Sequence, residues 1–318
     1  MVMTYKTYEE LTRDFFGHYN NKEYAAALDL LVKEADQFPE MAALTTFNKI
    51  CMLSVQNCVP EALALFREAG KRGYFYVAKM LREDADLAVL QGNPDFEQLF
   101  GEFKARFETA QAQSTPDRIV IEPPSTATAP HPLLLALHGN SNNAARSRRF
   151  WEPAAKAGWL TAVLQSSQLG MTNGAFAWND EAKSTHEIEQ HRVELDSRYS
   201  IDPKRVVIGG FSAGGRIAAS IGLTQPFAVR GFIGVGAYLA EKLDSWKELI
   251  SAAREHGTRV YLIIGDQDEG SYSDIVRFAD LLKENRVECE LKVYPGMGHV
   301  IQPDFDTVLV EALNFISA

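Results

Sequence analysis

The pentapeptide Gly210–Gly214, with the sequence Gly-Phe-Ser-Ala-Gly, is the feature that most constrains how this chain can fold. It follows the apolar run Val206–Ile208 and precedes the small-residue stretch Arg216–Ser220, a sequence typical of a strand, a tight turn and a helix. Such a turn holds its serine hydroxyl out at the end of a sheet, and side chains at the flanking positions would collide with neighbouring backbone. The alternative is a chance serine in an ordinary glycine-rich turn. The pattern therefore predicts an exposed, strained Ser212, which the rest of the chain must support.

A serine is a weak nucleophile at neutral pH, so it needs a base, and the base needs a carboxylate that orients it. Where a serine sits in a turn of this kind, the usual chain order is Ser, then Asp or Glu, then His. Downstream of Ser212, the apolar run Arg259–Ile264 reads as a buried strand that leads into Gly265–Asp268. This loop offers two carboxylates, Asp266 and Asp268, at the end of a predicted strand.

Two histidines follow Ser212 in the sequence, His256 and His299. His256 precedes its predicted strand, so we expect it at the opposite edge of the sheet. His299 comes after the predicted strand Leu291–Tyr294 and should reach the edge where the serine lies. Position relative to the strands therefore favours His299 as the base.

From about Thr115 to its end the chain resembles the α/β-hydrolase family, in its small esterase branch. The resemblance implies a mostly parallel central sheet flanked by helices, with Ser212 as nucleophile and His299 as general base. The family commonly places its acid as G-x-x-D, which corresponds to Gly265-x-x-Asp268 here. We therefore expect Asp268 to complete the triad, and Asp266, the alternative, to close the turn through its side chain.

An oxyanion hole is the other part that the resemblance implies. The family places a His-Gly pair at the end of an early strand, and here His138 and Gly139 follow the apolar run Pro132–Leu137. One donor would be the backbone N–H of Ala213, directly after the nucleophile. The second would be the N–H of Asn140, with Ser141 as the alternative, since asparagines and a serine stand where many relatives have a glycine run.

The first third of the chain is different in kind. Up to about Gln113 it has almost no strand-like runs and shows helical periodicity. An Ala-Leu-x-Leu pattern recurs at Ala27 and Ala62, 35 residues apart, and this spacing resembles the tetratricopeptide repeat of about 34 residues. The resemblance implies an all-α, tetratricopeptide-like domain that binds a protein partner or associates with itself.

We therefore expect a helical domain over residues 1–113, a linker with the first sheet strand over 114–132, and a catalytic domain over 133–318. The stretch between Val235 and Arg259 is too short for the lid insertion of many relatives. One hypothesis is that the helical domain covers the site instead and shapes substrate entry. The alternative is a docking or dimerisation domain remote from the site.

Composition excludes several other classes. A net charge of −10 on 318 residues argues against nucleic acid as a partner, because phosphate binding requires a basic surface. The three cysteines cannot all pair, and their spacing matches no zinc motif, so we expect free thiols and neither metal nor organic cofactor. The sequence has neither a membrane-spanning apolar run nor a signal pattern at its start, which favours a cytoplasmic location.

The substrate pocket is only loosely indicated. The loop after the predicted strand Leu160–Leu164 carries Phe176 and Trp178, which either line the pocket together with Phe211 or only pin the loop. We expect a carboxylesterase that cleaves small to medium acyl esters through an acyl-enzyme. The alternatives are a thioesterase, an oligopeptidase-type serine peptidase and, in another class, an interaction scaffold whose hydrolase site is vestigial.

Overall fold

The computed structural model describes residues 5–239 and 242–318, and the chain divides into two compact units. A helical unit extends to Ser114 and also includes the distant segment Leu169–Ala175. A sheet-containing unit consists of Thr115–Gln168 and Phe176–Ala318. No local pattern in the sequence predicts that residues 169–175 group with the helices. Within the described residues, the structure contains no helix that is both long and apolar enough to cross a membrane.

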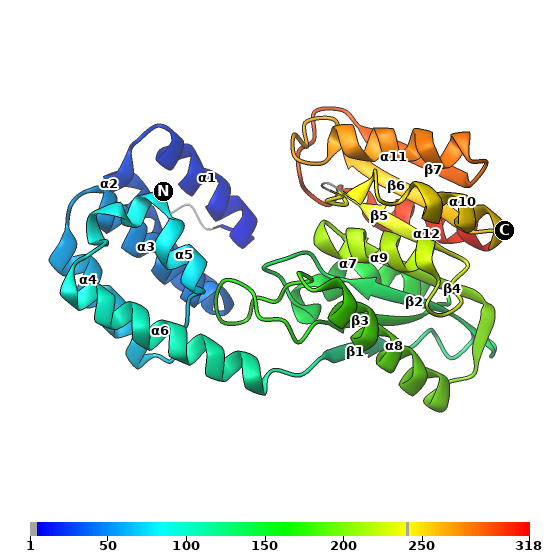
Figure 1. The fold of residues 1–318 in the computed structure, drawn as a ribbon, viewed down its shortest axis with the longest axis horizontal. Coiled ribbons are helices and arrows are strands. Elements are labelled where there is room, and N and C mark those ends of the chain that lie inside the picture. The colour runs from blue at the N-terminus through cyan, green and yellow to red at the C-terminus, as the bar shows by residue number, and fades with distance from the viewer. Residues whose placement is uncertain (1–4, 240–241) are drawn as a thin grey trace. The chain divides into compact units, whose positions relative to one another are not determined.

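The sheet of the second unit confirms the expected mostly parallel architecture (Figure 1). Among the described residues it has seven strands in the order β1-β3-β2-β4-β5-β6-β7, of which only β1 runs antiparallel to its neighbour. The strands are β1 (Asp117–Ile121), β2 (His131–Leu137), β3 (Leu160–Gln165), β4 (Ile201–Phe211), β5 (Gly231–Val235), β6 (Arg259–Gly265) and β7 (Glu288–Tyr294).

Helices cover both faces of this sheet, which is why the inner stretches of its central strands, such as Leu133–Leu137 and Val206–Ile208, are apolar. Leu133, Leu135 and Leu137 of β2 face one core, while Leu134 and Ala136 face the other. The first core is closed by α8 (Glu181–Arg198), α9 (Ala213–Thr224), α10 (Lys247–Glu255) and α11 (Tyr272–Glu284), and the second by α7 (Ala144–Lys156) and α12 (Phe305–Ser317).

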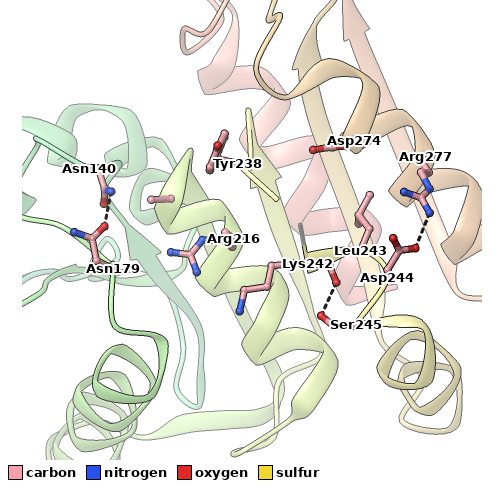
Figure 2. A pocket seen from close by; sticks show the side chains of 11 residues that line it. Asn140, Asn179, Arg216, Tyr238, Lys242, Leu243, Asp244, Ser245, Asp274 and Arg277 are labelled. Carbon is pink, nitrogen blue, oxygen red and sulfur yellow. Dashed lines mark hydrogen bonds and ion pairs between the residues drawn. The ribbon is translucent and has the colours of Figure 1, made fainter. Parts of the chain in front are cut away.

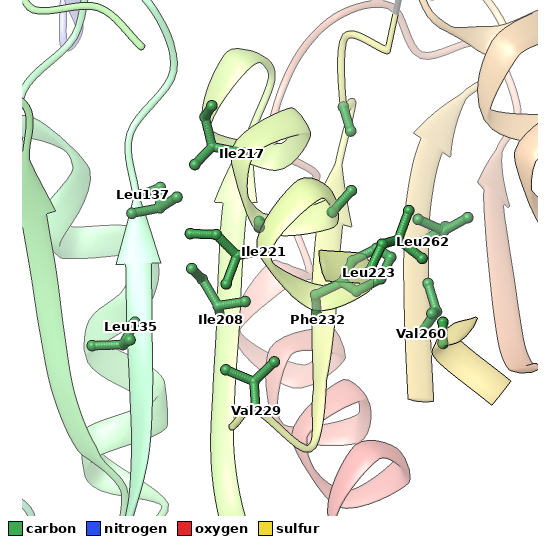
Figure 3. Packing of buried hydrophobic residues seen from close by; sticks show 14 of the residues in the cluster. Leu135, Leu137, Ile208, Ile217, Ile221, Leu223, Val229, Phe232, Val260 and Leu262 are labelled. Atoms are coloured by element: carbon green, nitrogen blue, oxygen red, sulfur yellow. The ribbon is translucent and has the colours of Figure 1, made fainter. Parts of the chain in front are cut away.

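Helix α9, which begins directly after Ser212, packs closely on the sheet (Figure 3). Its side chains Ile217 and Ile221 are fully buried among strand residues, and each such burial stabilises the fold by roughly 1.5–3 kcal/mol. Gly222 allows the close approach, because a Cβ there would lie 2.2 Å from the Phe232 ring. The helix that follows the serine is therefore rigidly seated on the sheet.

The helical unit has the all-α character expected from periodicity. Its first helices are α1 (Tyr8–Asn20), α2 (Tyr24–Glu34), α3 (Ala42–Val55) and α4 (Val59–Lys71), and short 3-10 turns cover Ala35–Gln37 and Pro39–Met41. After these come α5 (Ala78–Glu83), a 3-10 turn at Ala85–Leu90 and the long α6 (Pro94–Gln113).

The core of the helical unit explains the recurring alanines. Ala27 and Ala62 are both fully buried, as close helix packing requires of small residues. Phe66 of α4 packs its ring against the rings of Tyr76, Phe96 and Phe103 at centroid distances of 5.7–6.2 Å. The alanine pattern thus marks a real packing seam, whereas the tetratricopeptide resemblance itself stays a prediction.

Candidate active site

The turn after β4 has the strained geometry that the pentapeptide predicts. Ser212 adopts φ 54° and ψ −119°, a conformation that costs energy for a residue with a side chain. A Cβ on Gly210 would lie 2.3 Å from the carbonyl carbon of Gly214, and a Cβ on Gly214 would lie 2.4 Å from the His138 carbonyl oxygen. Only glycine fits at these two positions, and the result places the serine directly before the N-terminus of α9.

Three of the predicted side chains form a hydrogen-bonded series. The Oγ of Ser212 lies 2.9 Å from Nε2 of His299, and Nδ1 of His299 lies 2.6 Å from Oδ2 of Asp268. Asp268 follows β6 and is only 3% exposed, whereas the His299 side chain, after β7, is 40% exposed. A buried carboxylate, an accessible imidazole and a hydroxyl thus meet at the ends of three strands.

The two aspartates of the loop after β6 make different contacts. Asp266 is exposed, and its Oδ1 accepts a hydrogen bond of 2.7 Å from the Gly296 backbone N–H, which fastens the loops after β6 and β7 to each other. These loops approach closely at Gly265, where a Cβ would lie 2.0 Å from the Met297 carbonyl oxygen. That approach brings Asp268 to His299, whereas the Asp266 side chain joins two loops and does not close its own turn.

Aromatic packing also holds the imidazole of His299. The ring of Phe211, the residue before the serine, lies 4.8 Å from the imidazole centroid at an interplanar angle of 36°. Phe211 is half-buried, and its ring also contacts the site of a Cβ on Gly139 at 2.9 Å. Phe211 therefore packs between the imidazole and the loop after β2, where it restricts the positions that His299 can take.

The loop after β2 presents the predicted oxyanion donors unequally. The Ser141 backbone N–H donates to the Phe176 carbonyl oxygen at 2.9 Å and is already engaged. The Asn140 backbone N–H donates to no acceptor among residues 5–239 and 242–318. Ala213 begins α9, and the first N–H groups of a helix lack partners within it. Of the three predicted donors, the Asn140 and Ala213 N–H groups are therefore the two without an acceptor among the described residues.

The loop after β3 holds the Asn140 side chain at both ends. Its Oδ1 accepts the Trp178 backbone N–H at 2.9 Å, and its Nδ2 donates to Oδ1 of Asn179 at 3.0 Å. An antiparallel bridge between Asn142 and Phe176 adds a second attachment. Three successive residues, Asn140, Ser141 and Asn142, thus attach the loop after β2 to the segment that begins at Phe176.

Trp178 is buried against the loop after β2 and anchors it; this is one of the two roles considered for it. The side chain is 1% exposed, and its Nε1 donates to the His138 carbonyl oxygen at 2.8 Å. Its ring lies 5.0 Å from the His138 imidazole. Burial lowers the pKa of His138 to about 4, although a hydrogen bond with the Gly139 carbonyl oxygen opposes the shift. His138 is therefore neutral at physiological pH and fastens the loop.

A cavity of about 900 Å³ opens beside the two free N–H groups, and sequence reasoning missed it (Figure 2). Asn140 and Ala213 form part of its wall, Tyr238 stands at its rim with 49% exposure, and Leu243 adds a small apolar surface. Neither Phe176 nor Trp178 lines it. Most of the remaining wall is charged and comes from Arg216, Lys242, Asp244, Asp274 and Arg277.

Ion pairs preorganise this charged wall. Arg216 donates to the Trp178 carbonyl oxygen at 2.7 Å and pairs with Glu181 at 3.4 Å, while Lys242 reaches the same carboxylate at 2.9 Å. Burial raises the pKa of Glu181, but the hydrogen bonds from Ser220 and Lys242 and the charge of Arg216 outweigh it, so the net pKa is lowered. Arg216 lies one helical turn after Ser212, and this spacing could have identified it from the sequence.

One group of side chains among the described residues has donor atoms close enough to hold a metal ion. Sγ of Cys51 and the carboxylates of Asp84 and Asp86 lie within 4.8 Å of one another in the helical unit. Burial raises the pKa of the Cys51 thiol well above its usual range, and burial also raises the pKa of Asp86. The raised pKa of the Cys51 thiol disfavours the thiolate, which is the form of cysteine that binds a metal.

Comparison with known families agrees with this geometry. Residues 174–318 match the family described as phospholipase/carboxylesterase, and residues 7–111 match a family described as the N-terminal domain of α/β-hydrolase-like proteins. An acyl-protein thioesterase 1 from Neurospora crassa is 36% identical over 107 residues, which cover 33% of this chain and 43% of that protein. The same-named protein of Gibberella zeae is 32% identical over 117 residues, 35% of this chain and 47% of its own length.

The chain thus spans less than half the length of these curated relatives. Among solved structures, an uncharacterized protein from Bacillus cereus ATCC 10987 is 28% identical with a TM-score of 0.56, and the match covers 99% of both chains. The esterase PE8, at 16% identity and a TM-score of 0.51, shares the fold over 64% of this chain and 99% of its own. The sheet-containing unit thus has the α/β-hydrolase fold, its residues 174–318 match the phospholipase/carboxylesterase family, and residues 7–111 match an N-terminal domain found with such hydrolases.

Proposed function

We propose that this chain is a serine hydrolase that cleaves carboxylic esters through an acyl-enzyme, with Ser212 as nucleophile, His299 as general base and Asp268 as the orienting acid. The observation that carries the proposal is the unbroken hydrogen-bond series from the Ser212 hydroxyl to the buried Asp268 carboxylate. It speaks against a vestigial scaffold, because a site without a task has no reason to keep three side chains from three loops in register.

The first half of the reaction follows from which atoms face each other. With Nδ1–H donating to Asp268, Nε2 of His299 carries the lone pair that accepts the Ser212 proton as Oγ attacks the ester carbonyl. Asp268 then stabilises the imidazolium that forms. The negative oxygen of the tetrahedral intermediate rests on the Ala213 and Asn140 N–H groups, each of which contributes roughly 3–4 kcal/mol of transition-state stabilisation.

The second half repeats this geometry with water. His299 gives its proton to the departing alcohol, and the acyl group remains on Ser212. A water molecule beside Nε2 then loses a proton to His299 and attacks the acyl carbonyl at the same oxyanion site. Collapse of this second intermediate releases the carboxylic acid and returns the proton to Ser212. The exposure of His299 gives water the access that this step requires.

The cavity supports small to medium substrates with polar groups. Its volume of about 900 Å³ is within the usual range of small-molecule sites, and five of its eleven lining residues are charged. A long alkyl chain placed there would desolvate these charges without pairing them, which is unfavourable. An ester with hydrogen-bonding groups would instead meet both donors, such as Arg216, and acceptors, such as Asp274.

A thioesterase is the second candidate, and the likeness to proteins named acyl-protein thioesterase favours it. The same triad and oxyanion donors serve both reactions, because a thioester carbonyl passes through the same kind of tetrahedral intermediate. The leaving group distinguishes them. A thiolate departs without much help from a proton, so thioester cleavage depends less on protonation by His299 than oxyester cleavage does.

Hydrolysis of matched oxyesters and thioesters tests the proposal. We expect wild-type protein to release acid from acetyl and butyryl esters of p-nitrophenol, of aliphatic alcohols and of the corresponding thiols. Ser212→Ala should reduce each rate by about 10⁶-fold, because the triad acts as a unit. A preference above tenfold for the thiol substrates would select the thioesterase reading. Equal hydrolysis by Ser212→Ala and wild type would overturn both readings.

A further inference from the structure

The segment Leu169–Ala175 belongs to the helical unit by its contacts, although it lies within the sequence of the catalytic body. It leaves the sheet-containing unit after Gln168 and returns to it at Phe176. We call residues 169–175 the clamp. The chain therefore passes from one unit to the other and back within a single active-site loop.

Four hydrogen bonds and a β-bridge hold the clamp to the helices. Asn173 contributes two of them, since its Oδ1 accepts the Phe75 backbone N–H at 2.8 Å and its Nδ2 donates to the Gly73 carbonyl oxygen at 3.3 Å. Tyr76 forms an antiparallel bridge with Thr172, which is 3% exposed. The other two bonds run from Val77 N–H to the Met171 carbonyl oxygen, at 3.2 Å, and from Leu169 N–H to Oε1 of Gln111, at 2.9 Å.

The clamp is also closed on itself. The Gly170 N–H donates to the Ala175 carbonyl oxygen at 2.7 Å, and the Ala175 N–H donates to the Thr172 carbonyl oxygen at 3.1 Å. A Cβ on Gly170 would lie 2.9 Å from the backbone carbon of Ala175, so the two ends of the clamp are in close contact. A segment closed in this way moves as one piece.

Directly after the clamp, Phe176 holds the loop after β2, which carries the proposed oxyanion donor Asn140. The Phe176 N–H donates to the Asn142 carbonyl oxygen, and the Ser141 N–H donates to the Phe176 carbonyl oxygen, both at 2.9 Å. Two residues, Gly174 and Ala175, separate the Asn173 attachment from the Phe176 attachment. Because Asn173 and Phe176 are three residue steps apart, a span of at most about 11 Å, a shift of the clamp reaches the loop after β2 through a short piece of chain.

We propose that the clamp makes the helical unit a positioning element of the oxyanion hole, with Asn173 as a positioning residue for the Asn140 N–H. This inference rests on the proposed function, since it assigns a task to the loop that supplies the second oxyanion donor. It differs from the lid hypothesis. A lid sets which substrates enter, whereas the clamp sets how strongly every substrate's tetrahedral intermediate is stabilised.

Kinetics of the full-length Asn173→Ala variant test the inference. We expect kcat to fall about tenfold by the same factor for acetyl, butyryl and octanoyl p-nitrophenyl esters, with KM within twofold of wild type, because small displacements of a catalytic group are costly. Binding of a trifluoromethyl ketone, which places an oxyanion in the same hole, should weaken by a similar factor. Asn173→Asp keeps the acceptor for the Phe75 N–H and should recover part of the loss.

Asn93→Ala provides the matched control. Asn93 caps α6 in the same unit, and its side chain also makes two hydrogen bonds to the backbone, with the N–H groups of Asp95 and Phe96. The control should lower thermal stability as much as Asn173→Ala does and leave kcat unchanged. Equal kcat for Asn173→Ala and wild type, an equal loss in both variants, or a change confined to long acyl chains would each overturn the inference.

These experiments distinguish failure of the proposed function from failure of the clamp proposal. A wild type that hydrolyses no ester or thioester overturns the proposed function and the clamp with it. An active wild type with an unaffected Asn173→Ala variant overturns the clamp alone. A uniform drop in kcat at unchanged KM, absent in Asn93→Ala, supports both.

Discussion

The two sides of the active site are built in contrasting ways. The triad side consists of Ser212, Asp268 and His299, each carried on a short loop at the end of a parallel strand. The oxyanion side depends on Asn140, whose position is set by hydrogen bonds to residues 38 and 39 positions away in the sequence. The strand ends of the sheet position the proposed triad. The loop after β3, which is attached to the helical unit, positions the proposed oxyanion donor.

The contrast indicates which part of the site the sheet holds in place and which part depends on contacts with the helical unit. The ends of β4 and β6, which precede Ser212 and Asp268, are buried in the core, and the half-exposed edge strand β7 carries the His299 loop. The loop after β3 instead transmits the state of the helical unit to the oxyanion hole, because residues 169–175 are part of that unit.

The two aspartates after β6 give the largest contrast. We expect Asp268→Asn to lower kcat by about 10⁴-fold, because the amide cannot hold the His299 tautomer that accepts the serine proton. Asp266→Asn should change kcat by less than threefold, since Asp266 contacts only the turn at Gly296 in this region. Steady-state kinetics of both variants decide the assignment, and the reverse pattern would make Asp266 the triad acid.

The Asn140 side chain should have an intermediate effect. Asn140→Ala removes the hydrogen bonds to Trp178 and Asn179 but keeps the backbone N–H that we assign to the oxyanion hole. Loosening one donor should lower kcat by about 10- to 100-fold, less than the loss of a whole donor. Asn143→Ala, which removes a helix-capping side chain in the same loop, is the comparison for general disruption. Similar losses in both variants would argue that only loop stability matters.

Acid should destabilise the fold in part through His138, which lies beside the loop after β2. The pKa of His138 is about 4 in the folded protein, whereas an unfolded histidine titrates near 6.5. Between these values the unfolded state binds a proton that the folded state does not, so the free energy of unfolding falls as pH drops. The loss from this residue amounts to about 3 kcal/mol at pH 4.

Urea unfolding between pH 7.5 and 4 measures this loss in wild type and in His138→Gln. The variant should be less stable at pH 7.5 but show a shallower decline towards pH 4. Parallel curves for the two proteins would mean that His138 titrates normally in the folded state.

The smallest effect is expected at the wall of the cavity. Glu181→Gln leaves Arg216 and Lys242 without their shared carboxylate, so both cations become available to the cavity. Esters whose acyl group carries a carboxylate should then bind about two- to fivefold more tightly, while neutral esters are unaffected, because exposed charge pairs contribute roughly 0.2–1 kcal/mol. Identical KM changes for neutral and anionic esters would remove the charged wall from substrate recognition.

The sequence alone suffices to propose Ser212, Asp268 and His299 as the triad, for a physical reason. Catalytic groups at parallel strand ends lie next to strand-forming runs, so Ser212, Asp268 and His299 can be located from local patterns. The position of His256 before its strand likewise indicates that it lies at the opposite edge of the sheet from Ser212. Helical periodicity likewise identified the all-α character of the first third, although it does not reveal what that unit does.

The oxyanion side could not be predicted in the same detail. Nothing in the local sequence of Asn173 indicates that its amide bonds to residues about 100 positions earlier. The aromatic character of Trp178 fits a pocket wall and a loop anchor equally well, and only its burial against His138 separates the two. Deleting residues 1–113 would test the lid hypothesis poorly, because it also removes every helical partner of the clamp.

Covalent labelling of Ser212 tests the central claim most directly. A fluorophosphonate probe reacts with a serine only where a base activates it and an oxyanion hole accepts the phosphoryl oxygen. We predict a single adduct by intact mass on wild-type protein, none on Ser212→Ala, and slower labelling of Asp268→Asn. A folded wild type that forms no adduct, or an adduct of equal yield on Ser212→Ala, would contradict the account.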